Sequence, residues 1–379
     1  MARIVVFTAT VAGHNMEYLH HIYDVAVHRC ENQYVFVVPA SFEQVKHNLT
    51  WPQADHIRFD YITNEEVAAF QNKGMLASSY NMCKIVRNRL KKYHADKLFV
   101  VTLMSHLPFA PFMYGWRVKM SGVIYKIYLY EWKRASFLRR VSDVVKYQLL
   151  ARFPLFEHLF LLNDEPAVRL INRTYRSTKF RPLVDPYTPI EQLERQDLRQ
   201  EFSCSKEDKL FIHFGAMDAR KGTLQILSSL ALLNEEQRKH YCFVFAGRVA
   251  PAIKEEFYKR VEQLRSRVRI YVKDEFCSYD YLALLCEACD ALLIPYLETA
   301  QSSGVIGYAS QFQKPVIAPN RGLVGKLVRR YKLGVTTEVT PEGLLAAYRT
   351  IETSSPSITT EYVATHQVVT FQQQLSESL

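Results

Sequence analysis

The sequence predicts an α/β protein with parallel sheets, divided into two Rossmann-like domains. Three observations predict this class. Short apolar runs of strand length alternate with apolar-periodic runs of helix length along the chain. The 379 residues suffice for two domains of ordinary size, each with its own core. Three prolines fall within residues 181–189, where we place the domain boundary.

Five apolar runs predict strands in the first half of the chain, and periodic runs between them predict helices. The apolar runs are too short for helices and are rich in the residues found in strands that are buried on both faces. We expect strands at residues 4–7, 34–38, 57–61, 98–103 and 159–162, and helices at residues 16–29, 65–72, 79–93 and 141–152.

A second series of strands and helices extends from residue 210 to about residue 351. The two series predict one Rossmann-like domain over residues 1–184 and another over residues 185–355. Residues 356–379 remain as a C-terminal segment, in which residues 359–375 have the pattern of a terminal helix.

The composition is that of a globular protein, with 48% hydrophobic and 23% charged residues. No apolar run reaches the roughly 18 residues of a membrane-spanning helix, and the N-terminus is interpreted as a first strand rather than a signal peptide. Seven scattered cysteines favour a reducing compartment, so we expect a cytoplasmic protein. Cys286 and Cys289 lie in a helical pattern without a second pair, which favours core packing over zinc binding.

Residues 117–152 hold nine basic and two acidic residues, and so carry most of the formal net charge of +10. Tyr and Trp residues are interleaved with these cations. That combination suits an anionic membrane surface, where each Lys or Arg contributes about 1 kcal/mol, and predicts peripheral association with the inner face of the cell membrane. Nucleic acid would suit the same charge, but no nucleic-acid-binding signature occurs, so we expect no such partner. A solvated basic face is the simpler alternative.

Residues 290–322 have the pattern strand, polar loop, helix, strand, turn. Ser302, Ser303 and Gly304 directly precede a helix that is predicted to start near Val305, and the small hydroxyl residues suit a helix cap. A helix N-terminus at the carboxyl end of a parallel strand binds anions, and a diphosphate is the obvious ligand. An ordinary β-α-β unit with a Ser-Ser-Gly cap is the alternative.

A second anion-facing turn is predicted after the strand at residues 210–214. That strand runs into Gly215, and the following loop ends in Arg220, Lys221 and Gly222 before a helix. Two cations at a strand-to-helix turn suit the oxygens of a phosphate group.

Taken together, the loop from Gly215 to Gly222 and the Ser-Ser-Gly loop resemble the retaining nucleotide-sugar glycosyltransferases of the GT-B fold, family 4 type. The resemblance covers residues 205–340 well and the N-terminal half in outline. It implies two Rossmann-like domains facing a central cleft, with the C-terminal helix returning to the N-terminal domain. It also implies a UDP- or GDP-sugar donor, a glycan or lipid-linked acceptor, and a role in surface polysaccharide synthesis.

The sequence departs from the family pattern at three positions. Ala216 stands where the family has an arginine, so Arg220 or Lys221 must hold the phosphates. Of the two glutamates that the family carries, the second is replaced by Tyr308, and the first place falls on Ala300. Glu298 is the nearest carboxylate and is our candidate for contact with the sugar hydroxyls or the developing cation.

Candidate residues also lie at three other strand ends. Gly13 and His14 follow the first strand, where a glycine allows close approach of the backbone to donor or acceptor; a surface helix cap is the alternative for His14. His106 follows the strand at 98–103, and the resemblance implies a histidine beside the transferred sugar there. A structural histidine is the alternative. Phe276 belongs to the segment where the resemblance places the nucleotide base.

The implied reaction is sugar transfer with retention through an oxocarbenium-like transition state, in which the leaving diphosphate gains charge. Arg220, Lys221 and the amides near residues 302–305 would stabilise that charge, with His106, Glu298 and Lys221 as the catalytic candidates. No Asp-x-Asp occurs in the sequence, so we expect no metal and no cofactor. A non-catalytic relative that binds a sugar nucleotide or polyanion, a nucleotide-sugar epimerase, and a phosphorylase remain alternatives.

Overall fold

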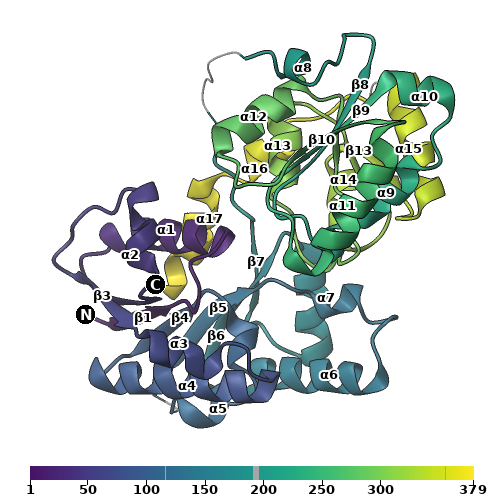
Figure 1. Ribbon diagram of the computed structural model, residues 1–379. Coiled ribbons are helices and arrows are strands. Elements are labelled where there is room, and N and C mark those ends of the chain that lie inside the picture. The colour runs from purple at the N-terminus through teal and green to yellow at the C-terminus, as the bar shows by residue number, and fades with distance from the viewer. Residues whose placement is uncertain (116, 191–195, 355) are drawn as a thin grey trace. The chain divides into compact units, whose positions relative to one another are not determined.

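The computed structural model describes residues 1–115, 117–190, 196–354 and 356–379. The chain forms two compact units (Figure 1). Unit 1 consists of residues 1–185 and 368–379, and unit 2 of residues 186–367. Each unit is a parallel sheet flanked by helices, which confirms the predicted α/β class.

Unit 1 contains a seven-stranded sheet in the order β3-β2-β1-β4-β5-β6-β7, with parallel pairing throughout. The strands β1, β2 and β4 form its centre and are almost completely buried, which explains their continuous apolar sequence. The strands are β1 (Arg3–Phe7), β2 (Gln33–Pro39), β3 (Ile57–Ile62), β4 (Lys97–Val100), β5 (Lys119–Ile124), β6 (Phe156–Leu162) and β7 (Phe180–Leu183).

The helices of unit 1 bury an apolar stripe against this sheet or against one another. They are α1 (His14–Val27), α2 (Phe42–Val45), α3 (Asn64–Phe70), α4 (Met75–Lys92), α5 (Ala110–Met113), α6 (Phe137–Arg152), α7 (Glu165–Tyr175) and α17 (Val368–Leu375). Among the described residues, no helix combines the length and the apolar character needed to cross a bilayer.

Unit 2 contains a six-stranded parallel sheet in the order β10-β9-β8-β11-β12-β13. Its strands are β8 (Lys209–Phe214), β9 (Tyr241–Ala246), β10 (Arg269–Lys273), β11 (Ala291–Leu293), β12 (Val316–Pro319) and β13 (Gly334–Thr337). Its helices are α8 (Leu198–Glu201), α9 (Thr223–Leu230), α10 (Glu235–His240), α11 (Pro251–Arg265), α12 (Tyr279–Ala288), α13 (Val305–Gln311), α14 (Gly322–Arg330), α15 (Pro341–Thr353) and α16 (Glu361–Thr365).

Both sheets reverse their strand order beside their first strand. In unit 1 the reversal lies between β1 and β4, and in unit 2 between β8 and β11. The crossover helices leave the sheet in opposite directions at such a switch point, so the loops at the carboxyl ends of these strands leave room for a ligand. The switch points are therefore the candidate locations of a functional site.

The C-terminal helix α17 belongs to unit 1, where it packs against α1 and β7. The Phe371 ring lies 5.2 Å from the Tyr18 ring, and the Gln374 side-chain oxygen accepts a hydrogen bond from the Val184 amide at 2.8 Å. The single helix that was predicted over residues 359–375 is wrong. Two helices, α16 and α17, lie there instead, separated at His366, whose ring stacks on Tyr362.

All five strands predicted in the first half are present, with ends shifted by up to three residues. Two further strands of unit 1, β5 and β7, were not predicted. In β5 the small polar residues Ser121 and Gly122 interrupt the apolar run, and β7 is a four-residue edge strand that contains Pro182. An edge strand tolerates a residue without an N–H group, so Pro182 does not exclude a strand here.

Candidate functional site

The two loops predicted to bind an anion lie against each other at the switch point of unit 2. The Leu297 amide, in the loop after β11, donates a hydrogen bond to the Arg220 carbonyl, in the loop after β8, at 2.7 Å. Gly222 has a φ of 73°, and a Cβ there would lie 2.1 Å from the Pro295 carbonyl oxygen. Only glycine therefore allows this close approach of the two loops.

The Lys221 side chain lies between the two loops. Its Nζ is 5.5 Å from the centroid of the Tyr296 ring and 3.2 Å from the position that a Cβ on Gly215 would take. Among the residues that the structure describes, no Asp or Glu forms an ion pair with this ammonium group. Lys221 thus presents a half-buried positive charge that has no ion-pair partner in the described part of the chain.

Arg220 has different surroundings from Lys221. Its Nε and Nη2 atoms donate to one carboxylate oxygen of Asp218, at 3.1 and 2.7 Å. The other oxygen of Asp218 accepts the Lys221 amide at 3.1 Å and so caps the short 3₁₀ turn η4 (Ala219–Lys221). The sequence predicted two equivalent cations, whereas in the structure Arg220 already has a partner.

His213 is a buried residue of the switch point that the sequence analysis missed. Its Nδ1 lies 2.8 Å from the Leu293 carbonyl, and its Nε2 lies 3.0 Å from the Thr223 hydroxyl. Burial lowers the pKa of His213 to about 4, so the ring is neutral at physiological pH. A single polar residue inside the apolar run of β8 was the signal that could have identified it. His213 connects β8, β11 and the start of α9.

The helix after the Ser-Ser-Gly loop begins at Val305, as predicted. The predicted capping role of the serines is wrong, because the cap residue is Gly304 and no side chain caps the helix. Ser303 is buried and donates its hydroxyl hydrogen to the Tyr296 hydroxyl at 3.1 Å, and Ser302 is half-buried. Ser303 therefore fixes the ring over which Lys221 lies.

Tyr308 occupies the position of the second family glutamate. Its buried ring packs edge-on against Phe214 and Tyr187, at centroid distances of 5.5 and 5.4 Å. An aromatic contact thus replaces a carboxylate there. Glu298 is half-buried in the loop after β11, and its amide lies 3.4 Å from the Arg220 carbonyl.

Three more loops of unit 2 end at the same edge of the sheet. The Asp274 carboxylate, in the loop after β10, accepts a hydrogen bond from the amide of Val249, in the loop after β9, at 2.8 Å. The Phe276 side chain in the loop after β10 is 74% exposed. After β12, the Leu323 amide donates to the Thr299 carbonyl at 2.7 Å. Phe276 was among the predicted site residues, whereas Thr299 was not predicted, because no motif in the sequence singles it out.

The predicted residues of unit 1 lie at its own switch point. Gly13 precedes α1 with a φ of 57°, a conformation that glycine adopts readily. His14 is the first helical residue; its side chain is 60% exposed, and its Nδ1 lies 3.2 Å from a Glu17 carboxylate oxygen. Both residues lie at the carboxyl end of β1.

His106 follows β4 but is buried. Its Nδ1 lies 2.6 Å from the Tyr114 hydroxyl, and its ring packs edge-on against Phe7. Burial lowers the pKa of His106 to about 3. The His106 ring is therefore neutral and enclosed, as expected for a structural histidine.

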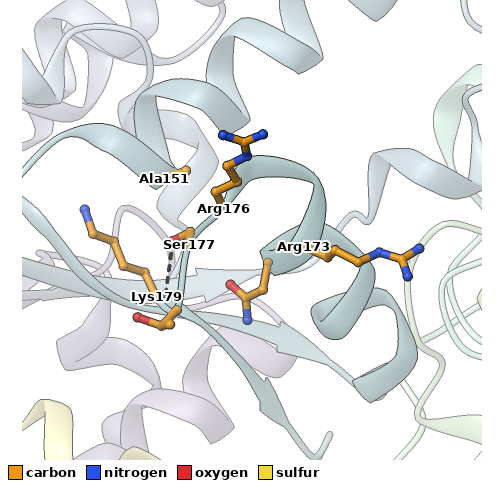
Figure 2. Close-up of a pocket in the computed structure, with 7 residues that line it drawn as sticks. Ala151, Arg173, Arg176, Ser177 and Lys179 are labelled. Atoms are coloured by element: carbon orange, nitrogen blue, oxygen red, sulfur yellow. Dashed lines mark hydrogen bonds between the residues drawn. The ribbon is translucent and has the colours of Figure 1, made fainter.

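A pocket of about 480 Å³ lies elsewhere, where α6 and α7 end (Figure 2). Its cations Arg173, Arg176 and Lys179 point in different directions rather than toward one centre (Figure 2). The Lys179 ammonium donates to the Phe153 carbonyl at 2.6 Å. Because the charges diverge, we assign no anion site to this pocket.

Among the described residues, one cluster has the composition of a metal site. Ligand atoms of His20, His21 and Asp24 on α1 lie within 4.8 Å of one another. Burial lowers the pKa of His21 to about 4, and the His20 Nε2 already contacts the Thr50 carbonyl at 2.8 Å. Neighbouring turns of a helix bring such side chains together without a ligand, so we assign no metal here.

Two doubly wound parallel α/β units of this kind are the architecture of the GT-B fold. Solved structures of the same fold cover nearly the whole chain. HepE from Anabaena, in complex with UDP and glucose, has a TM-score of 0.67 at 17% identity over 100% of this chain and 99% of its own. WaaG, a glycosyltransferase involved in lipopolysaccharide biosynthesis, has a TM-score of 0.69 at 16% identity, with the same coverage of both chains.

OtsA has a TM-score of 0.68 at 10% identity over 98% of both chains. No protein-family model and no curated protein matches the sequence. The chain therefore has the GT-B fold, as its resemblance predicted, and shares it with proteins of very different sequence.

Proposed function

We propose that this chain is a retaining glycosyltransferase that moves a sugar from a nucleoside-diphosphate donor to a glycan or lipid-linked acceptor, without a metal or cofactor. The observation that carries this proposal is the Lys221 ammonium, which has no acidic partner among the described residues and lies between the two switch-point loops. HepE, which shares the fold, has been solved with UDP and with UDP-glucose. A diphosphate is a suitable counter-ion for such a charge.

The donor diphosphate would lie beside Lys221 and the amides of residues 302–305. As the bond to the sugar breaks, the leaving diphosphate gains negative charge, and a fixed ammonium stabilises the transition state more than the ground state. Arg220 would contribute by exchanging its Asp218 partner for a phosphate oxygen. Glu298, on the adjoining loop, would contact the sugar hydroxyls or the developing oxocarbenium ion.

The nucleotide would extend from the diphosphate toward the loop after β10. The exposed ring of Phe276 offers an apolar face for the base. With Tyr308 buried against Phe214, no carboxylate at that position is available for the ribose. We therefore expect nucleotide binding to depend less on the ribose hydroxyls than it would with a glutamate at this position.

Gly13 and His14, at the switch point of unit 1, are our proposed candidates for contact with donor or acceptor. We assign His106 a positioning role, since its neutral ring is buried and contacts Tyr114 rather than solvent. The proposed location is cytoplasmic and peripheral on the inner face of the cell membrane, and the proposed pathway is surface polysaccharide synthesis.

A non-catalytic sugar-nucleotide-binding protein is the second candidate function. It is favoured by the replacement of the family glutamate with the buried Tyr308 and by the burial of His106. Such a protein would bind the donor at the same loops without turning it over.

Incubation of the full chain with UDP- and GDP-sugars, with and without glycan or lipid-linked acceptors, separates these functions. We expect a glycosylated product that requires the acceptor and retains the anomeric configuration by NMR. Lys221→Ala should lower kcat/KM at least about 100-fold, the scale of losing one transition-state donor, while the exposed control Lys259→Ala leaves it unchanged. Donor binding without turnover would establish the second candidate, and acceptor-independent isomerisation would establish an epimerase.

A further inference from the structure

Helix α6, labelled in Figure 1, belongs to unit 1. Several apolar side chains on one face of this helix are exposed. Phe137 and Leu138, in its first turn, are 77% and 79% exposed. Val141 and Val145 continue the stripe along the helix and are also exposed. Isolated exposed apolar residues are ordinary, but a continuous stripe on one helix indicates a surface that contacts something else.

The opposite face of α6 explains why this stripe points outward. Tyr147, Leu150 and Ala151 are buried. The Tyr147 ring stacks on Phe180 of β7 and on Tyr175 of α7, at centroid distances of 5.7 and 5.9 Å. These contacts fix the rotation of the helix, so the stripe cannot turn inward without breaking the aromatic cluster.

The same contacts revise the sequence-based interpretation of residues 117–152. Tyr147, one of the aromatic residues interleaved with the cations there, is an interior residue. Among those aromatic residues, Trp132 is exposed, and it lies just before the apolar stripe. The exposed apolar surface is therefore supplied mainly by Phe137 and by the aliphatic residues of α6.

Cations surround the N-terminal end of the stripe. Residues 131–152 contain six basic and two acidic residues, and Lys133, Arg134 and Arg139 are exposed. Arg139 and Arg140 lie near the start of α6, where the positive end of the helix dipole disfavours cations. Within the protein, Arg139 forms an ion pair with Glu131, and Arg140 donates to the Lys133 carbonyl at 3.0 Å, so both have local partners. Lys133 and Arg134 are the cations that an external anionic surface would contact.

We propose that the outer face of α6, defined as Lys133, Arg134, Phe137, Leu138, Val141 and Val145, docks on an anionic lipid bilayer. The helix would lie parallel to the membrane, with its apolar side chains at the level of the acyl boundary and its cations among the headgroups. At about 1.5 Å per residue, the exposed stripe from Phe137 to Val145 is about 12 Å long. This surface deepens the peripheral location proposed above by naming the residues that would make the contact, and its test does not depend on sugar transfer.

Flotation of the full chain with lipid vesicles tests the proposal. We expect binding to vesicles that contain phosphatidylglycerol, weaker binding to vesicles of phosphatidylcholine alone, and loss of binding at high salt. Phe137→Ser combined with Leu138→Ser should lower the partition coefficient at least about tenfold, because two side chains lose their burial. The matched control, Met75→Ser with Leu76→Ser, removes two other side chains that are 65% and 57% exposed, and should change nothing.

A charge variant completes the experiment. Lys133→Gln with Arg134→Gln should lower binding to the anionic vesicles about tenfold, while Lys84→Gln with Arg87→Gln, the same charge change on α4, should not. Equal losses in stripe and control variants would overturn the proposal. A second outcome would also overturn it: the chain does not bind vesicles, light scattering shows that it is a dimer, and Phe137→Ser with Leu138→Ser dissociates that dimer. Nucleotide binding by these variants is measured separately, so failure here does not affect the proposed function.

Discussion

Lys221 and Arg220 are neighbouring cations whose side chains lie in different electrostatic surroundings. The Arg220 guanidinium is paired with Asp218, and the Lys221 ammonium lies over the Tyr296 ring without an acidic partner among the described residues. The sequence predicted that this turn carries the positive charge. It could not distinguish the two cations, because the pairing depends on the side-chain conformation of Asp218 and on a loop about 75 residues further along.

At the same scale, buried histidines predict how stability depends on pH. Burial lowers the pKa of His213 to about 4 and of His106 to about 3, below the unfolded value of about 6.5. The unfolded chain therefore binds more protons than the native chain below about pH 6.5, and stability falls as the pH decreases toward 3.

Chemical denaturation between pH 7 and pH 4 measures this dependence. Each of these histidines should contribute a slope approaching about 1.4 kcal/mol per pH unit within its window. His106→Gln should flatten the dependence relative to the parent chain, and the surface variant His47→Gln serves as its control. A profile that is unchanged in His106→Gln would contradict the assignment of a buried neutral ring.

The elements that carry the site were predicted where an apolar run ends in a turn residue. The strand β8 and the start of α13 were predicted within one residue, and the order strand, loop, helix, strand that was predicted over residues 290–322 is present as β11, α13 and β12. The contact between the loops after β8 and β11 was expected only through the family resemblance. Gly222 provides it, because its left-handed backbone and missing side chain let Pro295 approach.

Gly222→Ala is the variant that tests this contact. The added Cβ would lie 2.1 Å from the Pro295 carbonyl and would occupy a strained backbone conformation, so we expect a loss of about 2–4 kcal/mol in the free energy of unfolding. Nucleotide affinity should fall with it, because the loops separate. The control Gly74→Ala meets no atom within 4 Å and has a negative φ, so it should cost little. Equal effects of the two variants on stability would show that the loops are not held together at Gly222.

At the scale of the whole molecule, two similar sheets each place their switch point beside candidate residues. In unit 1 these are Gly13, His14 and His106, and in unit 2 Gly215 and Lys221. The α/β class followed from the alternation of elements, and the GT-B fold from the family resemblance of the two strand-to-helix loops in residues 205–340. The outward face of α6 could not be predicted, because the helical pattern does not say which side of a basic, partly apolar helix packs against the sheet.

The central claim is that a nucleoside diphosphate binds between the Gly215–Gly222 loop and the Ser-Ser-Gly loop through Lys221. Isothermal titration of UDP, GDP and their sugars into the parent chain, Lys221→Ala and the surface control Lys259→Ala tests it directly. We predict that one nucleotide binds the parent chain and Lys259→Ala equally, and binds Lys221→Ala at least about tenfold more weakly, the effect of losing one charge-assisted contact. Equal affinity in all three proteins would contradict the claim.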